Sequence, residues 1–416
     1  MGSIIDMQRE YEPLKQLFQQ EFSKMVAVIS KLFGLQHIEL AEDIVSETFL
    51  LAAETWGIKG IPPNPAGWLY TVAKQKTLYQ FRRNKILEEK VIPELVISQH
   101  TEEEMTLQFT SQNIKDSQLQ MLFAVCNPVI ASEAQIGLAL RILCGFGIDE
   151  IAEAFLSNKE TINKRLFRAK EKLRTEKVEM EFPAENEIGE RLDNVLRVIY
   201  LLFNEGYYSK TENKVLRQDL CLEAMRLAVM LTEYERTNLP SANALLALMC
   251  FHASRFNARL SQEDSLVLYD QQNENLWDKG LINQGLHYLK LSAAGNEITS
   301  YHLEARIAYW HCIKEDTEEK WQSILELYDR LLQINYSPSV ALNRLFALYK
   351  VKGAEVALLE TEKLKLENNH FYFIFLAELY KNIDHQQAKL HLQKAFSLAK
   401  TQAEKQGIQA KMDGLE

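Results

Sequence analysis

Glycine and proline, the two residues that most often end helices, are scarce in this chain. Only 16 Gly and 9 Pro occur among its 416 residues. This scarcity favours helices joined by short loops, and it argues against a β-sandwich or a Gly-rich nucleotide-binding unit. The length is that of two or three domains, and 47% hydrophobic residues are enough for large cores. The sequence therefore predicts an all-α fold.

The net charge of −10 argues against a chain that binds nucleic acid over its whole surface. The charge is uneven, however. Residues 159–177 hold eight Lys or Arg against three Glu, and residues 64–85 hold five Lys or Arg and no acidic residue. Two local surfaces can therefore contact phosphates within an acidic chain.

Cysteine and histidine usage predicts neither disulfides nor a metal site. The five Cys are isolated, as suits a reducing compartment, and the nine His lack the spacing of zinc ligands. We expect no metal, no cofactor and no catalytic residue. The first residues do not resemble a signal peptide, and no apolar run reaches the length of a membrane span. The expected location is the cytoplasm.

Residues 145–174 have the spacing of two helices joined by a tight turn. Apolar residues line one face of each helix: Ile148, Ile151, Ala152 and Phe155 in the first, and Ile162, Leu166, Ala169 and Leu173 in the second. Ser157 and Glu160 have the spacing of a capping box at the start of the second helix. This is the layout of a helix-turn-helix, whose second helix enters the major groove of DNA.

The second of these helices carries the residues that we expect to contact DNA. They are Lys159, Glu160, Thr161, Asn163, Lys164, Arg165 and Arg168. A solvated basic face on an ordinary helical hairpin has the same charges, so charge alone does not decide between the two interpretations.

A second basic segment, residues 64–85, mixes cations with aromatic residues. The Gly- and Pro-rich residues 57–67 predict a loop, and Asn64 before Pro65 predicts a capped helix start. The candidate contacts with melted DNA, where aromatic rings stack on unpaired bases, are Trp68, Tyr70, Lys74, Gln75, Tyr79, Arg82 and Arg83. For Trp68 and Phe81, a place in the hydrophobic core is the favoured alternative.

Residues 39–56 predict a helix with an acidic stripe. Glu39, Asp43 and Glu47 recur every four residues, which places them on one helix face. Such a stripe suits contact with a partner protein, and a simply solvated face is the alternative.

These segments together resemble regions 2 and 4 of the sigma-70 family, in particular the extracytoplasmic-function sigma factors. Residues 41–56 resemble region 2.2, residues 64–85 resemble regions 2.3–2.4, and residues 145–174 resemble region 4, in the expected order with a linker between them. The resemblance covers residues 10–175. It implies a transcription initiation factor that binds core RNA polymerase, through its β′ and β subunits, and promoter DNA.

The resemblance also implies a role for each candidate surface. The 41–56 helix would dock on a coiled coil of β′ through Glu42, Asp43, Glu47 and Phe49. The 64–85 helix would open the minus-ten promoter element, and the helix-turn-helix would bind the minus-thirty-five element. Many family members carry Asn and Asp where this chain has Gln75 and Tyr79, which changes the residues expected at the base pocket.

The remaining chain resembles the extension of one sigma subgroup that ends in tetratricopeptide (TPR)-like repeats. Leu348-Tyr349-Lys350 recurs 31 residues later as Leu379-Tyr380-Lys381, and Ala357 recurs as Ala388. The predicted domains are sigma region 2 (10–85), a linker (86–115), sigma region 4 (116–177), a family-specific helical extension (185–290) and TPR-like repeats (291–416). We expect the extension to be regulatory, with a protein or peptide ligand on its repeats.

Two groups of residues in the extension leave alternatives open. Asn204–Tyr207 suits either a binding loop or a helix C-terminus with Gly206 just beyond it. Arg255, Asp270, Trp277 and Asp278 either line a pocket or cap helices, and the structural role is favoured.

Other function classes compete with a sigma factor. A helix-turn-helix regulator with a helical effector domain would need no region 2, so the 41–85 resemblance argues against it. An enzyme is disfavoured because the sequence holds no phosphate-binding loop, no GxSxG and no HExxH. A scaffold that uses only the repeats would not need the two basic helices.

Overall fold

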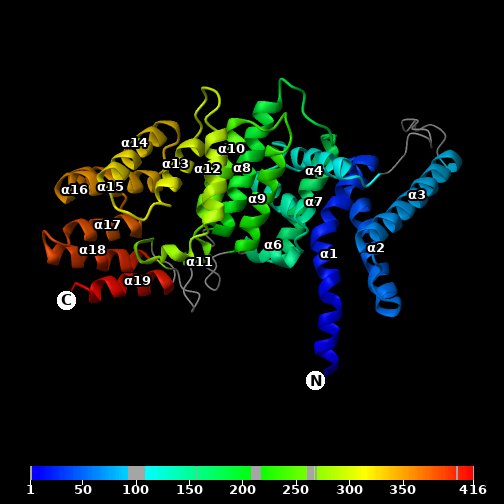
Figure 1. Cartoon of the computed structure of the whole chain (residues 1–416), viewed down its shortest axis with the longest axis horizontal. Helices are drawn as coiled ribbons and strands as arrows, with labels where there is room; N and C mark the ends of the chain where they lie inside the picture. Colours follow the sequence, from blue (N-terminus) through cyan, green and yellow to red (C-terminus); the bar gives the residue numbers. More distant parts are fainter. Residues whose placement is uncertain are drawn as a thin grey trace. The chain divides into compact units, whose positions relative to one another are not determined.

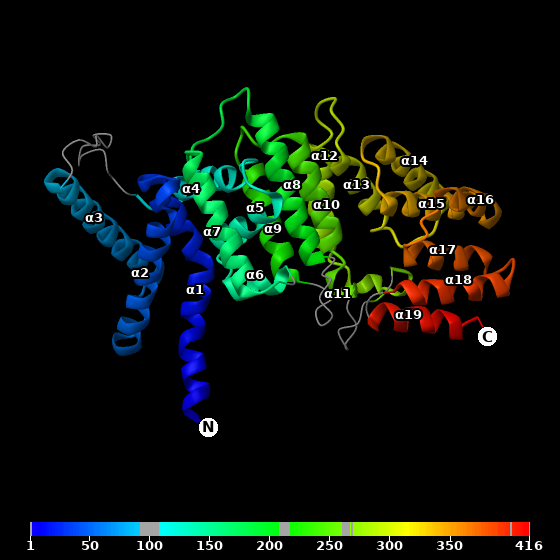
Figure 2. The same ribbon diagram turned by 180° about the vertical axis from the view of Figure 1, so that it is seen from behind.

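The computed structural model describes residues 2–91, 108–155, 157–207, 217–259, 267, 269–399 and 402–415. Over these residues the regular secondary structure is helical, with no strand (Figure 1, Figure 2). The predicted all-α fold is therefore confirmed. The chain divides into two compact units, Met1–Leu202 (unit 1) and Phe203–Glu416 (unit 2).

Unit 1 is built around one long helix. Its elements are α1 (Gly2–Phe33), η1 (Leu35–His37), α2 (Ile38–Lys59), α3 (Pro65–Val91), α4 (Ser111–Val125), α5 (Ser132–Leu138), the π-helical η2 (Ala139–Leu143), α6 (Ile148–Ala154), α7 (Lys159–Thr175) and most of α8 (Ile188–Tyr207). Helix α1 packs against α2, α3, α4 and η2. The segments predicted as sigma regions 2 and 4 therefore lie in one compact unit.

The apolar face of α1 explains this central place. Phe22, Met25, Val26 and Ile29 follow the i, i+3, i+4, i+7 spacing of one helix face, and all four are fully buried. Burial of side chains of this size contributes roughly 1.5–3 kcal/mol each. The predicted linker, residues 86–115, lies mostly outside the described residues.

The start of α3 agrees with its sequence signals. The helix begins at Pro65, and the Gly67 N–H donates to Asn64 Oδ1 at 3.0 Å. The loop before it is shorter than predicted, because α2 continues through Gly57 to Lys59. Gly60, at a φ of 79°, ends α2 in the left-handed conformation that glycine adopts without strain.

The predicted capping box at Ser157 is wrong by one residue. Helix α7 begins at Lys159, and Asn158 is its N-cap, with Oδ1 accepting the Thr161 N–H at 2.8 Å. Glu160 is therefore the second residue of the helix rather than the third, so it does not have the position that a capping box requires.

Unit 2 continues as a series of helices. After the end of α8 come α9 (Gln218–Thr232), α10 (Pro240–Ala253), α11 (Phe256–Arg259), η3 (Tyr269–Gln271), η4 (Glu274–Leu276), α12 (Lys279–Leu291), α13 (Ser300–Trp310), α14 (Glu318–Ile334), α15 (Pro338–Lys352), α16 (Ala354–Leu364), α17 (His370–Tyr380), α18 (His385–Leu398) and α19 (Gln402–Asp413). Helix α10 is buried nearly all round and packs against α9, α12 and α13. It is the core helix of this unit's first half.

The second half of unit 2 consists of helical hairpins (Figure 2). Helices α15 and α16 pack against each other, as do α17 and α18. The residues that recur at an interval of 31 occupy equivalent places: Ala357 and Ala388 are fully buried, while Leu359 and Leu390 are 65% and 51% exposed. The internal repeat is therefore a repeat of structure as well as of sequence.

Of the two alternatives for Asn204–Tyr207, the helix C-terminus is correct except for the place of Gly206. These residues form the last turn of α8, and Gly206 is inside the helix rather than beyond it. A Cβ on Gly206 would lie 2.7 Å from the Arg217 carbonyl oxygen and 2.7 Å from Cys221 Sγ. Glycine is needed there because α9 and the residue before it approach the backbone closely.

Candidate nucleic-acid interface

Helices α6 and α7 form the helix pair that the sequence predicts. Ile162, Leu166, Ala169 and Leu173 are buried along one face of α7, as their spacing predicts. In α6, Ile151 and Ala152 are buried, whereas Ile148 and Phe155 are half-buried. Because the apolar residues of α7 pack inward, most of its polar residues lie on the opposite, exposed side of the helix.

Most of the polar side chains in the first half of α7 are exposed. The exposed side chains that were predicted to contact DNA are Lys159, Glu160, Thr161, Asn163, Lys164 and Arg168. Arg165 is half-buried, with its guanidinium 5.7 Å from the Phe155 ring centroid. Lys159 lies 3.0 Å from Asp149, and Lys164 lies 4.0 Å from Glu160, but all four side chains are more than half exposed. Such pairs are weak and exchange readily for a phosphate.

Sequence reasoning missed one member of this face. Phe167, between Arg165 and Arg168, is 62% exposed. An exposed phenyl ring within a basic helix face provides an apolar contact of the kind that recognises a thymine methyl group. The sequence could have indicated this exposure, because the spacing of the buried residues of α7 places Phe167 on the opposite side of the helix.

Helix α3 holds a second exposed basic and aromatic surface. Tyr79 is 68% exposed, and Arg82 and Arg83 are exposed one turn further on. Lys74 is half-buried, and Lys76 forms an ion pair with Glu47 of α2 at 2.7 Å. The Phe81 side chain lies outside the described residues.

The N-terminal half of α3 borders an open depression of about 530 Å³. Its lining consists of Asn64, Gly67, Trp68, Thr71, Val72 and Gln75. Trp68 is half-buried and packs edge-on against Trp56, with ring centroids 5.3 Å apart, so one part of the indole is core and another lines the depression. Gln75 is exposed at its rim.

Tyr70 takes part in the core rather than in this surface. Its ring stacks on Phe109 at 4.7 Å, and its hydroxyl donates a hydrogen bond to the Glu21 carboxylate. Burial and the neighbouring Glu21 carboxylate raise the pKa of Tyr70. The hydroxyl is therefore protonated and occupied within unit 1.

Helix α2 presents a continuous exposed face with both acidic and apolar residues. It consists of Asp43, Glu47, Leu50, Glu54 and Ile58, which are all exposed and spaced by three or four residues. Leu50 and Ile58 are 61% and 87% exposed, which is high for large apolar side chains. Phe49 points the other way: it is 5% exposed and packs edge-on against Phe18. We call the exposed residues Asp43, Glu47, Leu50, Glu54 and Ile58 the α2 face.

Glu42 is buried and bound to two cations of the same unit. Its carboxylate accepts from Lys170 Nζ of α7 at 2.5 Å and from Arg141 Nε of η2 at 3.2 Å. The Arg141 guanidinium also donates to the Phe146 carbonyl at 3.2 Å. The predicted region 2 and region 4 segments are thus joined by one carboxylate.

Unit 2 contains residues whose roles the sequence left open. Asp278 caps α12, since its Oδ1 accepts the Leu281 N–H at 3.0 Å. Arg255 and Trp277 are buried near Tyr269. The Asp270 side chain lies outside the described residues.

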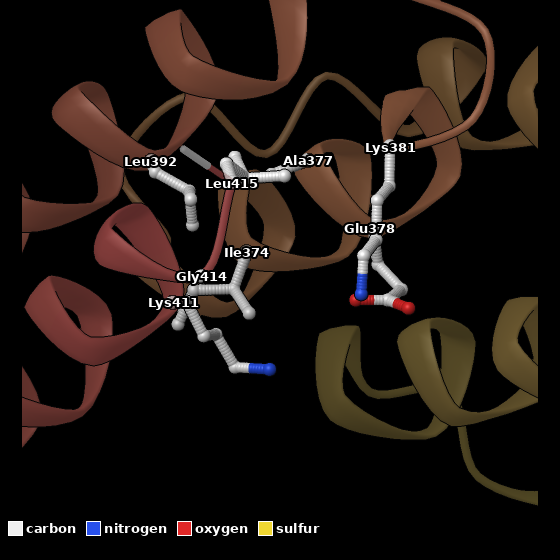
Figure 3. Close-up of a pocket in the computed structure, with 8 residues that line it drawn as sticks. All are labelled: Ile374, Ala377, Glu378, Lys381, Leu392, Lys411, Gly414 and Leu415. Carbon is white, nitrogen blue, oxygen red and sulfur yellow. The ribbon is translucent and has the colours of Figure 1, made fainter. Parts of the chain in front are cut away.

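A cavity of about 120 Å³ lies among α17, α18 and the end of the chain (Figure 3). Its walls are Ile374, Ala377, Glu378, Lys381, Leu392, Lys411, Gly414 and Leu415. Ligand pockets usually measure about 300–1,000 Å³, so this cavity is too small for one.

In the described part of the chain, no three His, Cys, Asp or Glu side chains are grouped as a metal site requires. Within the same ranges, none of the helices combines the length and the hydropathy of a bilayer-spanning segment.

Comparison with known proteins relates this chain to others without a described activity. A family of unknown function (DUF6596) matches residues 191–293, which extend from α8 to the end of α12. The uncharacterized protein R00370 of Rhizobium meliloti (strain 1021) is 31% identical over 386 residues, which cover 91% of each chain. No solved structure matches the chain. The relative therefore shares both units.

Proposed function

This chain belongs to the same family as the Rhizobium meliloti protein R00370, and we propose that it is an RNA polymerase sigma factor of the extracytoplasmic-function type. In this proposal, unit 1 binds core polymerase and reads the promoter. Unit 2 is a fused regulatory module with TPR-like repeats. The protein catalyses no reaction itself, and it acts in the cytoplasm.

One observation carries the proposal: an acidic chain exposes two separate basic and aromatic helix faces within a single unit. The faces lie on α3 and α7, and each combines cations with an exposed ring, Tyr79 or Phe167. One such face is common in DNA-binding regulators. Two faces suit a protein that recognises two promoter elements.

In the proposed complex, α7 lies in the major groove of the minus-thirty-five element. Lys159, Lys164 and Arg168 contact phosphates or guanine edges, and Asn163 reads a base edge. Phe167 adds an apolar contact. The exposed pairs of Lys159 and Lys164 are weak enough to be replaced by DNA.

The minus-ten element is opened on α3. Tyr79 stacks on an unpaired base, while Arg82 and Arg83 follow the backbone of the melted strand. The depression at Trp68 and Gln75 receives the flipped base, whose extraction from the duplex costs a few kcal/mol. Tyr70 is assigned a structural role, since its ring and hydroxyl are engaged inside the unit.

The α2 face docks on the β′ subunit of the polymerase. This replaces part of the set expected from the sequence, because Phe49 is in the core and Glu42 is paired inside the unit. Leu50 and Ile58 supply the apolar contact, and Asp43, Glu47 and Glu54 supply charge complementarity. Glu42 holds the two promoter-reading segments together in the free protein.

Binding of core polymerase in the absence of DNA tests this proposal. A helix-turn-helix regulator needs DNA, whereas a sigma factor forms a complex with the enzyme alone. We expect purified chain and core polymerase to co-elute in size-exclusion chromatography.

The double variant Asp43→Lys/Glu54→Lys should weaken that complex at least tenfold, because it reverses the charge of the α2 face. The matched variant Glu133→Lys/Glu185→Lys changes the same charge at two other exposed sites of unit 1 and should bind normally. Absence of any complex with the unaltered chain would favour the regulator.

A further inference from the structure

Three cationic side chains of unit 2 surround one tyrosine ring. The guanidinium carbon of Arg255 lies 5.6 Å from the Tyr269 ring centroid, Lys320 Nζ lies 5.4 Å from it and Lys314 Nζ lies 5.1 Å from it. These residues come from the turn between α10 and α11, from η3, from the segment after α13 and from the start of α14. Residues far apart in sequence thus bring positive charge to one buried place.

Arg255 and Lys320 are buried without a carboxylate partner among the described residues. Arg255 is 8% exposed, and its Nη2 lies 3.5 Å from His252 Nδ1. Lys320 is 1% exposed and donates to the Ile313 carbonyl at 2.7 Å and to the Tyr269 hydroxyl at 3.2 Å. These hydrogen-bond acceptors are neutral, and no carboxylate among the described residues forms an ion pair with Arg255 or Lys320. Unbalanced buried charge is strongly unfavourable.

The nearby acid, Asp316, is already engaged. Its carboxylate forms an ion pair with Lys350 at 2.6 Å and accepts the indole N–H of Trp321. It forms its ion pair with Lys350 and its charge also acts on Lys320, but no carboxylate among the described residues pairs with Arg255.

Unpaired polar atoms gather around the same ring. Arg255 Nε, Trp277 Nε1, His311 Nδ1 and Gln272 Oε1 are four of the eleven buried polar side-chain atoms without a hydrogen-bond partner in the described residues. The Trp277 and His311 rings lie 6.2 Å and 5.2 Å from the Tyr269 ring. Buried polar atoms are nearly always satisfied, so such a concentration needs an explanation.

His311 does not supply the missing negative charge and is itself neutral. Burial, together with Arg255 and Lys320, lowers the pKa of His311 to about 3. The uncharged ring can donate or accept one hydrogen bond at Nδ1.

We propose that the group formed by Arg255, Tyr269, Trp277, His311 and Lys320 is a binding site for a small oxyanion, bearing a carboxylate or a phosphate group. We call it the Tyr269 cluster. Arg255 Nε–H and Trp277 Nε1–H only donate hydrogen bonds, and an oxyanion oxygen only accepts them. Arg is the residue whose geometry best fits carboxylate and phosphate. The site goes beyond the proposed function, because neither DNA nor polymerase binding uses these residues.

Thermal unfolding of the full chain in the presence of defined anions tests this site. The probes are inorganic phosphate, acetate and citrate, each titrated at constant ionic strength against potassium chloride. We expect one class, phosphate or carboxylate, to raise Tm saturably, by about 5–10 °C at a hundredfold excess over Kd. The class that acts identifies the ligand chemistry.

Variants separate binding from folding. Arg255→Met should abolish the shift and, because it removes an unbalanced buried charge, raise Tm by about 2–4 °C without anion. Trp277→Phe keeps the packing but loses one donor, so its Kd should rise about tenfold. Arg306→Gln, at an exposed position on α13, should behave as the unaltered chain. No saturable shift with any probe, or an equal shift in Arg255→Met, would overturn the proposal.

Discussion

Glu42 of unit 1 and Arg255 of unit 2 are both buried charges, but among the described residues only Glu42 forms ion pairs with side chains of opposite charge. Two cations, Arg141 and Lys170, lie against the Glu42 carboxylate. Arg255 instead lies near Lys320 and Lys314 around Tyr269, and no carboxylate among the described residues pairs with it. The first arrangement is electrostatically complete. The second has no paired anion within the described ranges.

The difference separates a structural device from a recognition site. A charge that is balanced within the chain contributes to one folded arrangement, here the contact between α2, η2 and α7. A charge left unbalanced costs stability, and proteins tolerate that cost mainly where function requires it. We therefore assign Glu42 to the fold of unit 1 and Arg255 to ligand binding.

The largest expected effect is that of reversing the charge at Glu42. In Glu42→Lys three cations would meet at a site where the Glu42 side chain is only 10% exposed, and the loss of stability should be about 3–5 kcal/mol. Urea denaturation followed by far-ultraviolet circular dichroism measures it. Glu47→Lys changes the same charge on a side chain that is 63% exposed and should cost no more than about 1 kcal/mol. Equal losses of stability in the two variants would show that the buried ion pairs of Glu42 do not set it apart from the exposed Glu47.

An intermediate effect should appear in the pH dependence of unit 2. Burial, then neighbouring Arg255, lowers the pKa of both His252 and His311, for His311 to about 3. In the unfolded chain both titrate near 6.5, so below that pH the unfolded chain binds protons that the folded chain excludes. Stability is complete above pH 6.5 and falls as the pH drops toward 3.

The expected loss between pH 7 and pH 5 is about 2 kcal/mol for His311, and His252 adds to it in the same direction. Urea denaturation at several pH values measures it. His311→Gln keeps a buried hydrogen-bonding group without the titration, and it should remove the part of the dependence that His311 contributes. An unchanged slope in that variant would show that His311 is not held neutral by the fold.

The smallest effect on stability is expected at Lys159. Its pair with Asp149 joins side chains that are 61% and 75% exposed, so Lys159→Met should change stability by less than about 0.5 kcal/mol. If α7 binds DNA, the same variant should reduce the salt dependence of promoter binding by about one phosphate contact. Filter binding at several salt concentrations measures that slope. An unchanged slope would remove Lys159 from the interface.

Local sequence patterns predicted the helices well, but they did not predict which residues far apart in the chain pair with each other. The buried face of α7 follows from the spacing of Ile162, Leu166, Ala169 and Leu173. The burial of Glu42 does not, because its partners Arg141 and Lys170 lie 99 and 128 residues further along the chain. An acidic residue on a predicted helix face therefore appeared available for polymerase.

The Tyr269 cluster was only partly visible in the sequence. Arg255 and Trp277 were recognised as unusual polar residues beside apolar runs, but His311 and Lys320 were not connected with them. Four chain segments meet there, and nothing in their local spacing predicts that meeting. The close packing at Gly206 was missed for the same reason, since its near neighbour is the backbone of Arg217.

In vitro transcription with purified core polymerase tests the central claim most directly. The chain is added to core enzyme and genomic DNA, and the 5′ ends of the transcripts are mapped. The account predicts new start sites that share sequence elements near minus ten and minus thirty-five, and their loss in Arg82→Glu/Arg83→Glu and in Lys164→Glu/Arg165→Glu. Start sites identical to those of core enzyme alone would contradict it.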